Sequence, residues 1–232
     1  MRRLTLERGW AGARRAARSP GAVVVVDVLS FSTCAAVVTT RGAQVAPVRD
    51  NEEGAAMPGS ILAARRGQGG YSLSPTSLLA LPAGTTIALP SPNGATCCRL
   101  AAPAGLVVTG ALVNAGAVAA FCSRLDGDLT VVACGERKES DEDGAWRWAL
   151  EDDLGAGAIL SRLDGHLSPE AEACVAAFRE AEPELEGRLL DCESGVELVE
   201  RGYADDVRVA ARLDWLDAVP LLRDGILSAA TA

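Results

Sequence analysis

Short apolar runs alternate with longer stretches of mixed polarity along most of the chain. The clearest run covers residues 22–28, where successive valines are typical of a strand buried on both faces. The next stretch, 32–40, is small and apolar after a pair of hydroxyl side chains, which predicts a capped helix. The same alternation predicts strands over 44–48, 85–89, 106–109 and 129–133, and helices over 95–102, 114–125, 149–163, 168–180 and 207–213.

The order of these elements predicts an α/β fold. Strands that alternate with helices favour a mainly parallel sheet covered by helices on both faces. No internal repeat or long linker interrupts the pattern, so we expect one domain over residues 1–232. The glycine-rich stretch 54–71 indicates loops around a short helix at 61–66. Beyond it, we expect Asp205 to cap the last helix, and the final third to form a helical flank because strand signals are sparse there.

Charge and composition exclude several classes of function. The net charge of −9 and the pI near 4.7 argue against nucleic acid, because an acidic chain repels phosphate backbones. An anionic substrate would therefore need a metal ion, an arginine or a helix N-terminus to offset local repulsion. Seven cysteines without paired zinc spacing indicate reduced thiols in the cytoplasm, and a single histidine argues against a histidine metal site. No secretory signal or membrane-length apolar run is present, so we expect no membrane partner.

The first candidate for chemistry is Asp27, at the end of the valine-rich strand. A carboxylate there is costly to bury unless it is paired or bound to a cation, and magnesium prefers oxygen ligands. Ser32 and Thr33 could cap the following helix or donate to a bound anion. The alternative is a carboxylate that accepts hydrogen bonds from loop amides. No second acid follows two residues later, which argues against an aspartyl-nucleophile phosphatase.

A second candidate is the turn from Ser91 to Thr96. Gly94 allows the backbone to approach a ligand closely, and the amides of the next helix suit a phosphate or sulfonate. Asn93-Gly94 is also ordinary turn chemistry between a strand and a helix, and this alternative stays open. No Gly-Lys-Ser/Thr sequence follows, so the turn is not a P-loop.

Two charged clusters complete the candidates. Glu136 and Arg137 follow the strand over 129–133, and Arg137 could grip a charged oxygen with its planar fork. For residues 138–143, a solvated charged loop is the simpler interpretation. Glu151, Asp152 and Asp153 open a helix, where acids complement the helix dipole, although three adjacent carboxylates exceed that need. Two glycines in the same helix indicate that a neighbouring backbone packs very close.

Together these stretches resemble the 2-phosphosulfolactate phosphatase family. The matching pieces occur in the expected order and are VDVLSFST at 26–33, SPNGAT at 91–96, GALVNAGAV at 110–118, ALEDDLGAGAI at 149–159, SGVEL at 194–198, GYADDV at 202–207 and VP at 219–220. The chain differs from the usual pattern around the presumed pocket. It has Arg65 where an acid is common and Leu73 where asparagine is common, and it has Ser30-Phe31 in place of Arg-Ala.

The resemblance implies a three-layer α/β/α fold and a magnesium-dependent phosphatase. The implied reaction converts (2R)-2-phospho-3-sulfolactate to 3-sulfolactate and phosphate, a step of coenzyme M synthesis. Two rival interpretations are a phosphatase acting on another small phospho-hydroxy acid and a non-catalytic protein that binds anionic metabolites on the same fold. A homo-oligomer is possible, because alanine-rich helices suit either an interface or a core.

The candidate residues have specific expected roles. We expect magnesium to be held by Asp27 with Glu151 or Asp152, and Arg137 to hold a second anion or to offset charge in the transition state. Asp27, Glu151 and Arg137 are thus the expected catalytic residues. The residues expected to bind substrate are Ser30, Ser32, Thr33, Ser91, Asn93, Gly94, Thr96, Asn114 and Glu136.

Overall fold

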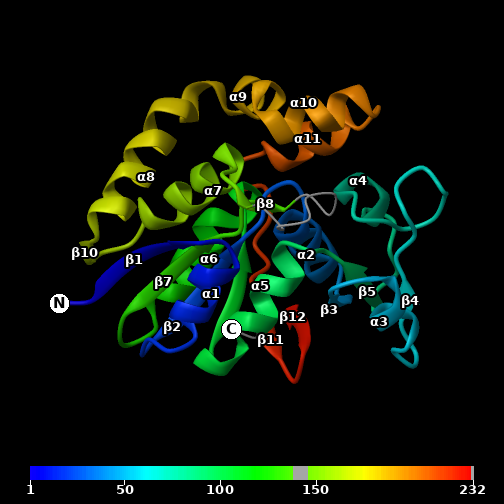
Figure 1. The fold of residues 1–232 in the computed structure, drawn as a ribbon, viewed down its shortest axis with the longest axis horizontal. Helices are drawn as coiled ribbons and strands as arrows, with labels where there is room; N and C mark the ends of the chain where they lie inside the picture. The colour runs from blue at the N-terminus through cyan, green and yellow to red at the C-terminus, as the bar shows by residue number, and fades with distance from the viewer. Residues whose placement is uncertain (138–145, 231–232) are drawn as a thin grey trace.

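A ten-stranded sheet organises the chain in the computed structural model, which describes residues 1–137 and 146–230 (Figure 1). Its strand order is β10-β1-β7-β2-β6-β11-β12-β3-β5-β4. The strands are β1 (Arg3–Arg8), β2 (Ala22–Val26), β3 (Gln44–Val48), β4 (Ile61–Leu62), β5 (Thr86–Pro90), β6 (Val107–Gly110), β7 (Leu129–Ala133), β10 (His166–Leu167), β11 (Pro220–Arg223) and β12 (Ile226–Ala229). A separate short pair joins β8 (Glu136–Arg137) to β9 (Trp146–Arg147).

The large sheet consists of two parallel blocks joined by an antiparallel hairpin. Strands β10, β1, β7, β2 and β6 are parallel to their neighbours, and so are β3, β5 and β4. Between the blocks, β11 pairs with β6 and β12 pairs with β3, both antiparallel. Leu221 and Leu227 of the hairpin are buried and lie in register with Val108 and Val45. The sheet is therefore mainly parallel but mixed.

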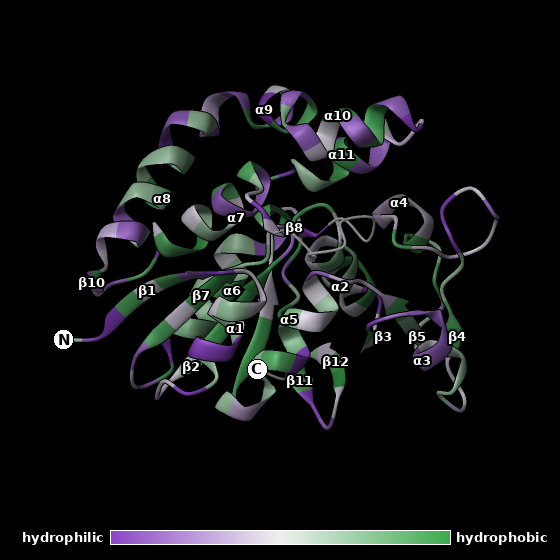
Figure 2. Cartoon of the chain, viewed as in Figure 1, coloured by the Kyte–Doolittle hydropathy of each residue, from purple (hydrophilic) through white to green (hydrophobic). Residues whose placement is uncertain are grey.

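Helices pack on both faces of the sheet, which confirms the predicted three-layer arrangement. Helices α1 (Gly9–Ala16) and α5 (Gly94–Ala101) pack together on one face, and α6 (Ala115–Ser123) and α7 (Leu150–Leu160) cover the other. The α2 helix (Phe31–Thr40) packs against β3, β6 and the hairpin. Apolar colour concentrates in the strands and in the helix faces that meet them, whereas α3 (Asn51–Ala55) and the outer helices carry more polar residues (Figure 2).

The predicted helical flank forms an arch over one end of the sheet (Figure 1). It begins with α8 (Pro169–Ala181), which packs on α7, and continues through α9 (Leu185–Asp191), α10 (Glu193–Glu200) and α11 (Ala204–Ala210). The far end of the arch contacts α4 (Pro75–Leu78). Ser168 caps α8 by accepting a hydrogen bond from the Ala171 amide. This arch brings α10 close to the loops that follow the central strands.

Several local predictions were wrong. Residues 61–66 contain strand β4 and a bridge between Ala64 and Ser72 instead of a helix. The structure has β1 and α1 near the N-terminus, where alternating charged residues obscured the apolar period. The last helix begins at Ala204, so Asp205 lies within its first turn and does not cap it.

The core is built mainly from alanine, valine and leucine, as the low aromatic content predicts. All seven cysteines are buried and unpaired. They therefore act as small apolar side chains in the packing. No helix in the described part of the chain has the length and apolarity needed to cross a membrane.

Candidate active site

Asp27 lies directly after β2 and links two loops. Its side chain is 5% exposed, and its Oδ1 accepts a hydrogen bond from the Phe31 amide at 3.1 Å. Its Oδ2 accepts one from the Gly94 amide at 2.8 Å and a longer one from the Ser91 hydroxyl at 3.4 Å. A carboxylate has about four acceptor positions, so these bonds leave room for a further ligand. Asp27 thus fixes the β5–α5 turn against the end of β2.

The β5–α5 turn is also tied to the loop after β7. The Asn93 amide group donates to Glu136 Oε1 at 2.9 Å, and its carbonyl oxygen accepts from the Arg137 amide at 3.1 Å. Both ends of the Asn93 side chain are therefore engaged with one short strand. This arrangement holds the Glu136 carboxylate beside the loop that carries Ser91.

The acidic start of α7 faces the same loops. Glu151 and Asp152 are each 3% exposed. Asp152 accepts hydrogen bonds from the Val28 amide at 2.7 Å and the Gly135 amide at 2.8 Å, one at each oxygen. The helix approaches closely because Gly155 has no side chain: a Cβ there would lie 2.7 Å from Val28 Cγ2. The close backbone predicted for this helix is found at Gly157, where a Cβ would overlap the Cys174 carbonyl oxygen, whereas the closest atoms at Gly155 belong to side chains.

The third acid of α7 points elsewhere. Asp153 forms a two-point ion pair with Arg8, at 2.7 and 3.1 Å, and accepts a hydrogen bond from the Trp148 indole at 3.0 Å. These contacts join α7 to the end of β1. Asp153 therefore contributes to the packing of the loops around the site.

A cavity of about 160 Å³ opens where these loops meet the arch; hereafter it is called the inner cavity. Five of the predicted residues line it: Asp27, Ser30, Ser91, Asn93 and Glu136. The other lining residues come from the loop after β2, the glycine-rich stretch, the β5–α5 turn and α10, and are Leu29, Arg66, Leu73, Pro92, Ser194, Glu197, Leu198 and Arg201. The inner cavity therefore has both carboxylates and arginines in its lining.

Burial makes the carboxylates of this site hard to ionise. Desolvation, with the negative charge of Glu151, outweighs the hydrogen bonds from Phe31 and Gly94 and raises the pKa of Asp27 to about 6. Desolvation likewise raises the pKa of Glu136 to about 7, against the opposing hydrogen bond from Asn93. The pKa of Asp152 is also raised, by burial and then by the charges of Asp27 and Glu151. Asp27, Glu136 and Asp152 therefore bind protons more tightly than exposed carboxylates do.

Comparison with known proteins agrees with the sequence motifs. The family model described as 2-phosphosulpholactate phosphatase matches residues 12–225. The chain belongs to this family. A protein of Carboxydothermus hydrogenoformans named probable 2-phosphosulfolactate phosphatase is 33% identical over 213 residues, which cover 86% of this chain and 85% of that protein. A protein of Methanothermobacter thermautotrophicus named 2-phosphosulfolactate phosphatase is 29% identical over 211 residues, which cover 88% of each chain.

In this family member, four residues expected to bind substrate use their hydroxyl or amide groups in hydrogen bonds to the protein itself. Ser32 donates to the Val25 carbonyl at 3.1 Å, and Thr33 donates to the Val28 carbonyl at 2.8 Å. Thr96 makes a longer hydrogen bond of 3.4 Å to the Ser91 carbonyl. Asn114 accepts from the Ala111 amide and donates to the Ala218 carbonyl, both at 2.9 Å. None of the four lines the inner cavity.

Two further groups expected to contact the substrate, the Gly94 amide and the Arg137 guanidinium, also contact other parts of the protein. The Gly94 amide, expected to bind phosphate, donates to Asp27 and to the Ser91 hydroxyl. The Arg137 guanidinium lies 3.8 Å from the centre of the Trp10 ring and does not line the inner cavity. The Asp27–Gly94 bond agrees with the alternative weighed from the sequence, a carboxylate that accepts from loop amides. Residues 138–143, interpreted as a solvated loop, lie outside the described residues.

Sequence reasoning missed the arginines of the site. Arg66 donates to the Ser30 hydroxyl at 2.8 Å and pairs with the buried Asp206 at 3.4 Å. Arg147 pairs with Glu193 of α10 at 2.7 Å, which holds the arch near Glu136. Arg66 lies in a glycine-rich stretch without a regular apolar period, so only its charge could have marked it as a candidate for the site.

The donor chemistry of this family member suits a magnesium ion bound through few protein ligands. Among the described residues, no group of three or more His, Cys, Asp or Glu side chains is arranged to hold a metal. Magnesium keeps several waters and is usually held by one or two carboxylates together with substrate phosphate. Asp27 and Glu151 are buried acids that repel one another, and a divalent cation between substrate and protein would relieve that repulsion.

Proposed function

We propose that this protein hydrolyses (2R)-2-phospho-3-sulfolactate to 3-sulfolactate and phosphate. The observation that carries the proposal is the inner cavity, whose lining brings Asp27 and Glu136 together with Arg66. The names of the relatives from Carboxydothermus hydrogenoformans and Methanothermobacter thermautotrophicus support this substrate. The buried, unpaired cysteines support a site of action in the reducing cytoplasm.

In this proposal Arg66, which lines the inner cavity, binds the phosphoryl group. Arg66 is held by Asp206 and Ser30, so its planar fork is oriented before substrate arrives. The Ser30 hydroxyl lines the same cavity, accepts from Arg66 and can donate its own proton to a phosphate oxygen. These contacts would offset the repulsion that an acidic protein exerts on an anionic substrate.

The acidic residues of the site would hold magnesium and orient water. We assign the metal to Asp27, which lines the inner cavity, together with the buried Glu151, whose negative charge acts on Asp27. Magnesium, when bound, would polarise the phosphate oxygens and neutralise part of their charge. Glu136 lines the inner cavity and is held by Asn93, so its carboxylate is placed to orient the attacking water.

The test is phosphate release from synthetic 2-phosphosulfolactate by the purified protein, first with a chelator and then with added magnesium. We expect turnover only with the metal. Turnover in chelator would remove magnesium from the proposal while leaving the phosphatase activity. No release under either condition, with the protein shown to be folded, would overturn the activity itself. A panel of other phospho-hydroxy acids tests the substrate, since a preferred substrate without a sulfonate would contradict the proposed one.

A further inference from the structure

A second cavity adjoins the inner cavity. It has a volume of about 490 Å³ and is lined by residues from the glycine-rich stretch, the end of β5 and the end of α10. Arg66, Leu73 and Arg201 line both cavities. The second cavity, hereafter called the outer cavity, therefore shares part of its wall with the inner cavity.

The charges of the two cavities differ sharply. Asp27, Glu136 and Glu197 line the inner cavity. Among the described residues, the lining of the outer cavity includes Arg65, Arg66 and Arg201 and no acidic residue. In a chain of net charge −9, three arginines around one small space form a local site for an anion.

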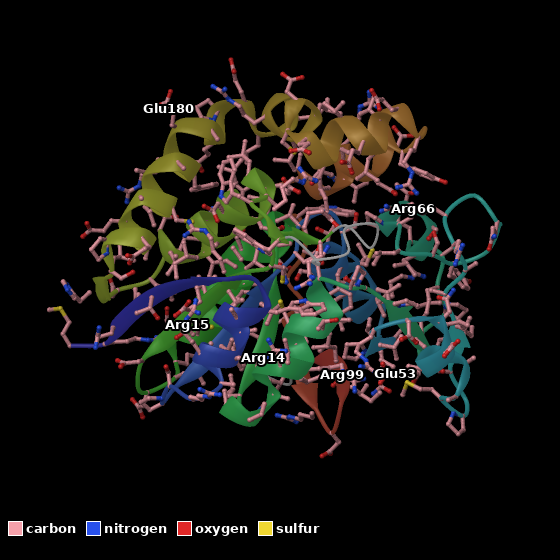
Figure 3. The ribbon with its side chains drawn as sticks, in the orientation of Figure 1. Arg14, Arg15, Glu53, Arg66, Arg99 and Glu180 are labelled. Atoms are coloured by element: carbon pink, nitrogen blue, oxygen red, sulfur yellow. The ribbon has the colours of Figure 1, made fainter. Side chains whose placement is uncertain are left out.

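An aromatic ring lies beside two of these three arginines. The Tyr203 ring lies 5.3 Å from the Arg66 guanidinium and 6.0 Å from that of Arg201. Arg66 is only 12% exposed and is paired with Asp206, whereas Arg65 and Arg201 are exposed. Within residues 1–137 and 146–230, no ion pair joins Arg65 or Arg201 to a carboxylate. Figure 3 shows Arg66 beside α4, at the open end of the arch.

We infer that the outer cavity binds the sulfonate of a substrate whose phosphoryl group occupies the inner cavity, with Arg65 and Arg201 as the specificity-determining residues. The inference rests on the proposed function. A sulfonate is ionised throughout the working pH range, and the arginine fork presents several donors to its oxygens. Arg66, at the shared wall, would contact the phosphoryl side, which leaves the two exposed arginines for the distal anion.

The test compares two substrates that differ only in the sulfonate, 2-phosphosulfolactate and 2-phospholactate. In the double variant Arg65→Gln/Arg201→Gln, we expect kcat/KM for 2-phosphosulfolactate to fall roughly tenfold or more, mainly through KM. The value for 2-phospholactate should stay within about twofold, because it lacks the group that these arginines bind. Arg212→Gln is the matched control. Arg212 is also exposed and stacks on an aromatic ring, that of Trp215 at 3.9 Å, but it lines neither cavity.

Two results would overturn the inference while leaving the phosphatase activity intact. One is an equal fall for both substrates, which would assign the arginines to the carboxylate or the phosphate. The other is no fall for 2-phosphosulfolactate. If the natural protein hydrolyses neither substrate, the proposed function fails, and calorimetric binding of 3-sulfolactate then decides the inference separately. Equal affinity of the natural protein and the double variant for 3-sulfolactate, or no binding by either, would reject it.

Discussion

The Asp27 carboxylate accepts a hydrogen bond from the Gly94 amide at 2.8 Å, although 67 residues separate the two in the chain. This bond connects the end of β2 to the first residue of α5, and Asp27 also lines the inner cavity. Asp27 therefore has two proposed tasks, since it organises the loops and would also hold the metal. Variants at and around this pair can separate the two tasks.

Asp27→Asn tests the charge of this side chain. The substitution keeps the shape and one carbonyl oxygen but removes the negative charge that would hold magnesium. We expect turnover of 2-phosphosulfolactate to fall by about a hundredfold or more. Thermal melting should show a folded protein, because the variant also removes a buried charge. Phosphate release within a few-fold of the natural protein would exclude Asp27 from the chemistry.

Gly94→Ala tests the close approach of the two loops. A Cβ at this position would lie 2.5 Å from Phe31 Cδ1 and 2.6 Å from Asp27 Oδ2, so Asp27 would have to move. We expect unfolding in urea to show a loss of about 1–3 kcal/mol, together with reduced turnover. Gly187→Ala is the control, because a Cβ on that exposed helical residue would meet nothing within 4 Å. The control should be neutral or stabilising by up to about 1 kcal/mol, and equal effects of the two variants would contradict the prediction.

The apolar pattern predicted the sheet better than it predicted the site. The valine run of β2 had to be a buried strand, and this places Asp27 at its end. In contrast, the hairpin that joins the two blocks has strands of only four residues each, too short for a clear alternation. The residues of the site missed from the sequence lie in irregular or helical segments. Arg66 and Arg201 come together only because the arch folds over the glycine-rich stretch, and no local pattern encodes that contact.

Asp206→Asn tests whether the orientation of Arg66 matters. Asp206 is 1% exposed, accepts hydrogen bonds from the Ser74 and Thr76 hydroxyls, and pairs with Arg66 through its other oxygen. The asparagine retains one acceptor but turns an amide toward the guanidinium. We expect KM for 2-phosphosulfolactate to rise several-fold, with a smaller change in kcat, because Arg66 loses its fixed direction.

A structural role alone would predict a different outcome for Asp206→Asn. Stability would fall, but KM measured well below the unfolding temperature would be unchanged. Asp205→Asn is the matched control, since Asp205 is the neighbouring residue and pairs with the exposed Arg208 at 2.8 Å. That variant should leave both KM and stability close to those of the natural protein, because exposed ion pairs contribute little.

The raised pKa values predict how the metal-free protein responds to pH. The folded state raises the pKa of Asp27 from 3.8 to about 6, so it binds a proton more tightly than the unfolded chain does. The stabilisation from this proton is complete below about pH 4 and is lost as pH rises through about pH 6. The shift corresponds to roughly 3 kcal/mol at most. The pKa of Glu136 is raised from 4.5 to about 7, so its bound proton also stabilises the folded state. This stabilisation is lost as pH rises through about pH 7.

Urea unfolding in chelator between about pH 5 and pH 8 measures this effect. The natural protein should lose stability across that range, and Asp27→Asn should lose less because its buried amide does not ionise. Added magnesium should restore stability to the natural protein mainly above about pH 6, where the carboxylates are charged, and should restore little to the variant. Parallel pH profiles for the two proteins would show that Asp27 does not carry the buried charge. An equal gain from magnesium at pH 5 and pH 8 would place the metal away from these carboxylates.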